Sequence, residues 1–165
     1  SGDQPPLNNP LPVWDMLAGN AAATGLLAAE RYRARTGKGQ LIRLALTDVA
    51  LATVANMSIT TEIEINGTER GPNGNEIYGA YGRDFLTSDG RRVMVVAISR
   101  RQWINLVETT DLATQFGKLA QEHKIDLTDE QVRYDFRKDI SAILEPWFRQ
   151  RTLADIATKL TDNVS

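Results

Sequence analysis

The stretch PVWDMLAGNAAATGLLAAERYRARTGKGQLIRLAL, residues 12–46, decides the fold. Apolar and small residues recur at helical spacing from Asp15 to about Arg35, which predicts a helix with Asp15 as its candidate N-cap. Gly37 is the predicted C-cap, because glycine adopts the left-handed conformation without strain. The alanines and glycines on one face of this helix allow another backbone to approach it closely.

The segment after this helix predicts a strand and a second helix. Residues Gln40–Leu46 alternate two partly apolar sets, which is typical of a strand buried on much of both faces. Thr47 or Asp48 can cap a helix that runs to about Thr60. Helix, strand and helix together form one turn of a doubly wound α/β protein. A single strand is not a sheet, so this segment needs partner strands from elsewhere.

The second half predicts a small α+β unit. Strands are expected at Tyr78–Thr87 and Arg92–Ile98, joined by a turn whose Asp89-Gly90 pair is a strong hairpin signal. Thr152 opens the last helix, with Asp155 in the capping-box position. Further helices are expected at Arg100–Thr110, Leu112–His123 and Val132–Leu144, the last of which Pro146 is expected to end or kink.

Composition excludes several classes of protein. The 165 residues carry a formal net charge of −2, which argues against a nucleic-acid footprint over the whole chain. The absence of cysteine from the sequence excludes a disulfide scaffold, a thiolate nucleophile and a Cys-ligated metal. The single histidine, His123, argues against a His-rich metal site or a Ser-His-Asp triad. The sequence also lacks a membrane-length apolar run and a signal-peptide pattern, so we expect no membrane partner and a cytoplasmic location.

Two features are candidates for chemistry. A carboxylate at a helix start, as at Asp15, is kept ionised by the positive end of the helix dipole, and a carboxylate nucleophile needs that state. From its position alone, a plain N-cap is the simpler explanation of Asp15. The stretch Gly71-Pro-Asn-Gly-Asn75, which precedes Tyr78, predicts either a lid over a site or a surface turn.

Three segments in the first third resemble the family III CoA-transferases, which include formyl-CoA transferase, carnitine CoA-transferase and α-methylacyl-CoA racemase. They are residues 12–19 with Asp15, the small-residue stretch 25–31, and the Arg-Thr-Gly-Lys-Gly-Gln motif that opens residues 35–46. Thr87–Gly90, the strand to Ile98 and Arg101–Trp103 resemble the family's small domain, and the resemblance runs from Pro12 to about Leu160. Within the family, Tyr78–Phe85 and Asn66–Thr68 are most similar to the branch of mesaconyl-CoA C1–C4 transferases (2-methylfumaryl-CoA isomerases).

This resemblance implies a reaction and its site. Asp15 would be the nucleophile that carries CoA as an aspartyl-CoA thioester, in an inter- or intramolecular transfer between an acyl-CoA and a carboxylic acid. The CoA thioester is then a substrate, and no metal or nicotinamide cofactor is implied. The glycine-containing loop lies where the transferases place a loop over the reacting thioester, although it lacks a run of consecutive glycines. The implied substrate-binding residues are Gly71, Asn73, Gly74, Asn75 and Tyr78.

The resemblance also implies an architecture. The fold class is α/β, a fragment of the family III CoA-transferase fold in a longer chain. Residues 1–65 would be a helix-strand-helix segment of the large α/β domain, and residues 66–165 a small α+β domain with the hairpin and the C-terminal helices. Family enzymes form interlocked homodimers and bind most of the CoA upstream, so the isolated fragment is expected to be inactive.

Two other functions remain open from the sequence. In the racemase branch of the family, the matching Asp works with a His in α-proton transfer, but His123 does not match that His. The other possibility is a non-catalytic α+β interaction module, in which Asp15 is only a cap and the helices of Val132–Leu160 bind a partner.

Overall fold

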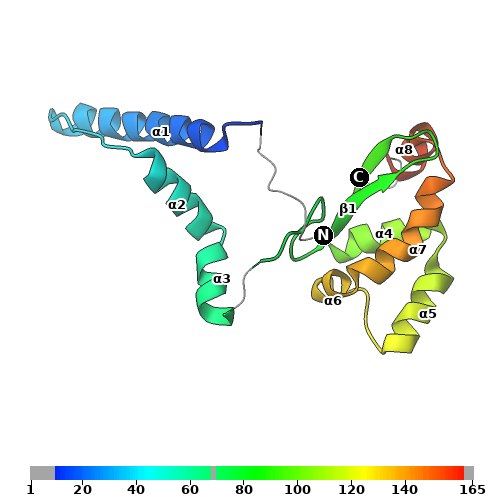
Figure 1. Cartoon of the computed structure of the whole chain (residues 1–165). Helices are drawn as coiled ribbons and strands as arrows, with labels where there is room; N and C mark the ends of the chain where they lie inside the picture. Colours follow the sequence, from blue (N-terminus) through cyan, green and yellow to red (C-terminus); the bar gives the residue numbers. More distant parts are fainter. Residues whose placement is uncertain (1–9, 68–69, 162–165) are drawn as a thin grey trace. The chain divides into compact units, whose positions relative to one another are not determined.

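The computed structural model describes residues 10–67 and 70–161 (Figure 1). The chain divides into two compact units, Ser1–Pro72 and Asn73–Ser165. Most of the described residues are helical, with one two-stranded sheet in the second unit. The expected mixed α/β class is therefore confirmed. None of the helices in the described ranges is long and apolar enough to span a bilayer.

The first unit contains α1 (Val13–Thr36), α2 (Leu46–Asn56) and α3 (Ile59–Asn66). Pro12 occupies the N-cap position of α1, so the expectation that Asp15 is the N-cap is wrong. The helix begins two residues earlier than the sequence pattern indicates, and Asp15 lies in its first turn. The predicted C-cap is confirmed, because Gly37 has a φ of 72° and its N–H donates to Arg33 O.

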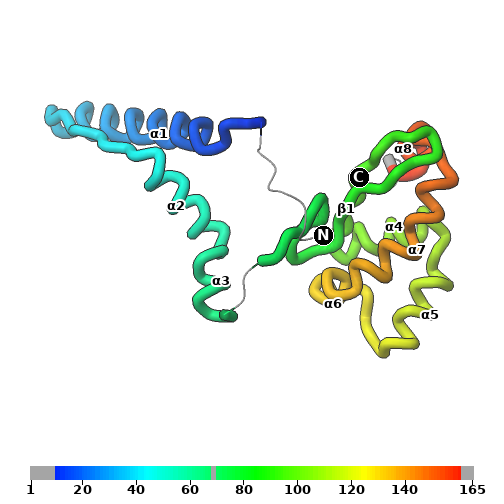
Figure 2. The backbone as a smooth tube through the Cα atoms, viewed as in Figure 1, coloured from blue at the N-terminus to red at the C-terminus, as the bar shows by residue number. Residues whose placement is uncertain are grey.

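The predicted strand at Gln40–Leu46 is absent, and its residues are exposed. Residues 38–45, which we call the return segment, instead run back along α1 (Figure 2). The Ile42 side chain lies 3.4 Å from where a Cβ on Gly25 would be, which is an ordinary contact distance, so this segment lies directly against the small-residue face of α1. A strand needs a hydrogen-bonded neighbour, and none of the described residues of this unit forms one.

The second helix also ends earlier than expected. α2 stops at Asn56 rather than near Thr60, because Ser58 adopts a left-handed backbone with φ of 59°. After this break α3 begins at Ile59 and ends at Asn66, followed by Gly67 as a C-cap with φ of 64°. Thr68, which belongs to a motif used for the family branch, lies outside the described residues.

The second unit is built on the expected hairpin. β1 (Tyr81–Leu86) and β2 (Arg92–Ala97) pair antiparallel, with Tyr81 opposite Ala97 and Leu86 opposite Arg92. Gly90 in the connecting turn has φ of 73°, as an Asp-Gly turn requires. The helices of this unit are α4 (Arg100–Thr110), α5 (Ala113–His123), α6 (Glu130–Asp135), α7 (Arg137–Arg149) and α8 (Leu153–Thr161).

Helix prediction is confirmed at α4, whose bounds match, and is wrong in the Val132–Leu144 region. There the chain breaks at Phe136 between α6 and α7. Pro146 does not end α7, which continues to Arg149. The carbonyl that an N–H at position 146 would bond belongs to Ala142, and both residues are exposed, so water can satisfy that carbonyl.

The core of the second unit lies between the hairpin and its helices (Figure 1). Phe85 of β1 stacks on Phe148 of α7 with ring centroids 4.4 Å apart. Trp103 of α4 packs edge to face against Tyr81 at 6.3 Å and Phe116 at 4.9 Å. Strand residues with a period of two and helix residues with a period near 3.6 thus supply one shared core.

Arg133 is fully buried in this core. Its guanidinium donates to Leu127 O at 3.0 Å, to Ala97 O at 3.3 Å and to Ile98 O. It therefore joins the end of β2 to the segment before α6. Burial lowers the pKa of this guanidinium, but an arginine side chain stays charged in a protein.

The hairpin turn is joined to the start of α8. Ser88 N donates to Arg151 O at 2.9 Å, and Leu153 N donates to Asp89 Oδ1 at 3.2 Å. Thr152 and Asp155 form the predicted capping box, since each side chain accepts the other's backbone N–H at 3.2 Å. These bonds fix the last helix against the turn.

Candidate active site

Asp15 is exposed in the first turn of α1. The helix starts with Val13, and Met16 N donates to Pro12 O at 3.1 Å to close the first turn. The carboxylate thus lies at the positive end of a 24-residue helix. An exposed, ionised carboxylate has the two properties that a nucleophile needs, access and a lone pair.

The small-residue face of α1 supports this helix within its unit. The half-buried positions of α1 recur at helical spacing, and α1 contacts α2 as well as the return segment. The opposite face exposes large apolar side chains, among them Leu26 at 64% and Leu27 at 71%. Those half-buried positions are Leu17, Ala18, Ala21, Gly25 and Ala29.

The glycine-containing loop is a tight turn with its own hydrogen bonds. Asn73 Nδ2 donates to Glu76 O at 3.0 Å, and Glu76 N donates to Asn73 O at 3.1 Å. Gly74 has φ of 58°, a conformation that side chains rarely adopt. The amide of Asn73 therefore shapes the loop in this structure.

The next two predicted residues contact the body of the second unit. The amide of Asn75 hydrogen-bonds the Asp84 carboxylate, and this bond, followed by the ion pair with Arg92, lowers the pKa of Asp84. The Tyr78 ring packs edge to face on Tyr134 with centroids 5.5 Å apart. Tyr78 is still 41% exposed, so part of its ring can meet a ligand.

The structure brings Asn73, Gly74, Asn75 and Tyr78 together in one loop of the second unit. Asp15 and Gly71 lie in the first unit, and Gly71 is exposed with no atom near its Cβ position. The sequence analysis did not find Arg137, which donates to Glu76 Oε2 at 3.0 Å from 61 residues away. No local pattern signals so distant a contact.

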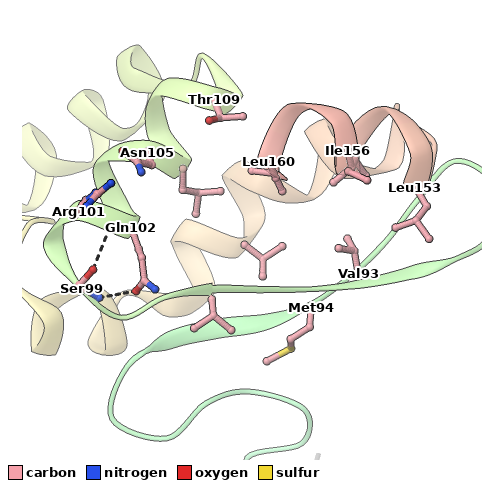
Figure 3. A pocket seen from close by; sticks show the side chains of 14 residues that line it. Val93, Met94, Ser99, Arg101, Gln102, Asn105, Thr109, Leu153, Ile156 and Leu160 are labelled. Atoms are coloured by element: carbon pink, nitrogen blue, oxygen red, sulfur yellow. Dashed lines mark hydrogen bonds between the residues drawn. The ribbon is translucent and has the colours of Figure 1, made fainter. Parts of the chain in front are cut away.

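A groove of about 630 Å³ lies between β2, α4 and α8 (Figure 3). Val93, Ile156 and Leu160 line its apolar part, while Arg101 and Asn105 lie on its polar side. None of the predicted site residues lines this groove. Gln102, at its edge, closes the capping box of α4, since its Oε1 accepts a hydrogen bond from Ser99 N at 2.9 Å, and Trp103 is buried in the core.

Residues 1–164 match the sequence profile described as CoA-transferase family III. The chain therefore belongs to CoA-transferase family III, and the family resemblance is confirmed. It is 46% identical over 150 residues to the 2-methylfumaryl-CoA isomerase of Chloroflexus aurantiacus. That match covers 91% of this chain and 37% of the relative, so the chain spans little more than a third of the relative's length.

A solved structure shares the fold. The crystal structure of a hypothetical protein (Rv3272) from Mycobacterium tuberculosis superimposes with a TM-score of 0.67 over 97% of this chain and 40% of the other. The two sequences are 22% identical, so this likeness concerns the fold alone.

Proposed function

We propose that this chain is part of an enzyme that transfers CoA between carboxylates and carries it on Asp15 as an aspartyl-CoA thioester. The observation that supports this most directly is the exposed carboxylate in the first turn of α1, in a chain of CoA-transferase family III. The relative's name, 2-methylfumaryl-CoA isomerase, indicates a substrate that is the thioester of a dicarboxylic acid. In such a substrate the second carboxylate can be the acceptor, which makes the transfer intramolecular.

The reaction runs through two kinds of intermediate. The Asp15 carboxylate attacks the thioester carbonyl and the C–S bond breaks. CoA departs as its thiolate, and the acyl group is now joined to Asp15 as a mixed anhydride. The thiolate then attacks the Asp15 carbonyl carbon, which releases the acid as a carboxylate and leaves the aspartyl-CoA thioester. The acceptor carboxylate then attacks the aspartyl-CoA thioester, which releases the CoA thiolate and forms a second mixed anhydride. The thiolate attacks the acceptor's carbonyl carbon in this anhydride, which gives the new acyl-CoA and regenerates the Asp15 carboxylate. The exchange is redox-neutral, so the proposal requires no metal or nicotinamide cofactor.

Two features of the chain support these steps. The positive end of the α1 dipole stabilises the negative charge that develops on the Asp15 carbonyl oxygen when the CoA thiolate, and later the acceptor carboxylate, attacks that carbonyl. The loop of Asn73, Gly74, Asn75 and Tyr78 is the proposed cover of the thioester, with Gly71 at its approach. Covering the anhydride excludes water, which would otherwise hydrolyse it.

The proposal includes an interlocked homodimer of the whole enzyme. The apolar side chains that α1 exposes, such as Leu26 and Leu27, support this because large exposed apolar faces mark contact surfaces. Light scattering of the whole enzyme gives the mass of a dimer if this part holds. The mass of a monomer contradicts it.

The test of the reaction is Asp15→Asn in the whole enzyme, assayed for CoA exchange between an acyl-CoA and a carboxylic acid. We expect kcat to fall by about a thousandfold or more, because the amide is not a nucleophile. Asp48→Asn is the matched control, since Asp48 also lies exposed in the first turn of a helix of the same unit. Near-normal exchange by Asp15→Asn refutes the nucleophile. Exchange of the α-proton without CoA exchange identifies the racemase reaction instead.

A further inference from the structure

Residues 73–78, the loop to which we assign substrate contact, are held by residues distant in the sequence. Glu76 Oε2 accepts a hydrogen bond from Arg137 Nε at 3.0 Å, and each of the two side chains is 26% exposed. An ion pair that is largely shielded from water is screened less than one on the open surface. This pair therefore ties the middle of the loop to the start of α7.

Arg137 is itself fixed in orientation. Its Nη1 donates to Tyr134 O at 2.8 Å, and its guanidinium lies over the Tyr134 ring, 4.3 Å from the centroid. The same ring receives the edge of Tyr78. The corner between α6 and α7 thus holds the loop at two points, Glu76 through Arg137 and Tyr78 through Tyr134.

The end of the loop that joins β1 is also fixed. Ile77 N donates to Gly82 O at 2.8 Å. The Ile77 side chain lies over Gly82 so closely that a Cβ there would be 2.5 Å from Ile77 Cδ1. Asn75 adds the hydrogen bond to Asp84. Each of the four consecutive residues 75 to 78 thus makes a specific contact with the body of the second unit. A freely moving lid would not make all of these contacts at once.

We propose that Arg137 is a positioning residue, which acts through Glu76 to hold the loop as a preset wall over the reacting thioester. This rests on the proposed function, because only a CoA thioester gives the wall something to cover. Groups that are held in place before the substrate arrives need no reorganisation during the reaction, and small misplacements of such groups reduce rates steeply. Arg137 itself does not touch the substrate in this proposal.

The first test is amide hydrogen exchange at Glu76, whose N–H donates to Asn73 O within the loop, and at Ile77, whose N–H donates to Gly82 O of β1. In Arg137→Ala we expect exchange there to be faster by about tenfold or more, as local opening becomes easier. Arg149→Ala is the control, since Arg149 also lies on α7 and pairs with a glutamate, Glu145, at 2.9 Å without contacting the loop. Unchanged exchange in Arg137→Ala overturns the anchor.

The second test is kinetic and uses the whole enzyme. We expect Arg137→Ala and the milder Glu76→Gln to lower kcat by about tenfold or more with KM changed less than about threefold, while Arg149→Ala retains both. The swap Glu76→Arg with Arg137→Glu is expected to recover most of the lost kcat. If the role of the pair is merely structural, the variants have a lower melting temperature but the folded enzyme has an unchanged kcat, and this result overturns the proposal. A swap that recovers none of the lost kcat also overturns it.

The two proposals fail in different ways. If the wild-type enzyme shows no CoA-transfer activity, the proposed function is wrong. If amide hydrogen exchange is unchanged in Arg137→Ala, only the proposal that Arg137 anchors the loop is refuted. If Asp15→Asn abolishes CoA exchange and Arg137→Ala leaves kcat at the wild-type value, the nucleophile stands and the positioning role is refuted.

Discussion

The two units differ in how their helices are stabilised. In the second unit, helices α4 to α8 bury side chains such as Phe148, which is 0% exposed. In the first, α1, α2 and α3 bury none of their described side chains, and Leu27 is 71% exposed. The helices of the first unit are stabilised by their caps, by alanine-rich sequence and by contacts with neighbouring segments. Those of the second unit are stabilised by a shared core. The proposed nucleophile lies on the unit without a core, and the proposed loop on the unit with one.

Phe148→Ala is expected to have the largest effect on stability of the substitutions that compare the two units. Removing a ring stacked at 4.4 Å on Phe85 in a closed core is expected to cost about 3 to 5 kcal/mol of unfolding free energy. In the 165-residue chain by itself, without the proposed partner subunit, Leu26→Ala on the exposed face of α1 is expected to change the unfolding free energy by about 0.5 kcal/mol or less. Guanidinium unfolding followed by tryptophan fluorescence measures both, because Trp103 and Trp147 lie in the core of the second unit and Trp14 lies on α1 of the first. Equal effects would contradict the difference between the units.

Substitution of one arginine in each unit compares a buried arginine with a partly exposed one. Arg133→Met leaves the carbonyls of Leu127 and Ala97 buried without their donor, so we expect a loss of about 3 kcal/mol. Arg70→Met in the first unit removes the partner of Glu62, an ion pair at 2.6 Å that touches no core, and we expect about 1 kcal/mol or less. The same unfolding measurement ranks the two. A larger effect at Arg70 would show that the first unit is the more tightly packed.

Substitution of Asp84 is expected to cost less than that of Phe148 or Arg133, and its effect depends on pH. The bond from Asn75 and the pair with Arg92 lower its folded pKa, so its contribution to stability is present above the unfolded pKa of about 3.9 and is lost as pH falls through the folded pKa. Solvent around Arg92 screens the pair, so we expect Asp84→Ala to cost about 1 kcal/mol at pH 7. The difference from wild type should shrink below about pH 4. A difference that grows in acid would contradict the assigned partners.

Local signals in the sequence predicted much of the second unit. Asp89-Gly90 forms the predicted hairpin turn, and Thr152 with Asp155 opens α8 as predicted. Each of these involves residues within four positions of one another, so the pattern is complete in the sequence.

The errors arise where structure depends on distant residues. The strand at Gln40–Leu46 needs a neighbouring strand, which the described residues of its unit do not contain. Arg133 occurs in a charged run that suggests a solvated surface, yet it is buried by β2, 36 residues away. The anchor between Glu76 and Arg137 could not be predicted for the same reason. Asp15 stays a prediction, and it is the family motif, not helix capping, that points to it.

The most direct measurement of the central claim is trapping of the covalent intermediate. The whole enzyme is incubated with its acyl-CoA substrate, quenched in acid, digested with trypsin and analysed by mass spectrometry, with Asp15→Asn as the control. The account predicts CoA in thioester linkage on the peptide that ends at Arg31, assigned to Asp15 and absent from the variant. CoA exchange that proceeds with the thioester on another residue, or that persists in the variant, would contradict it.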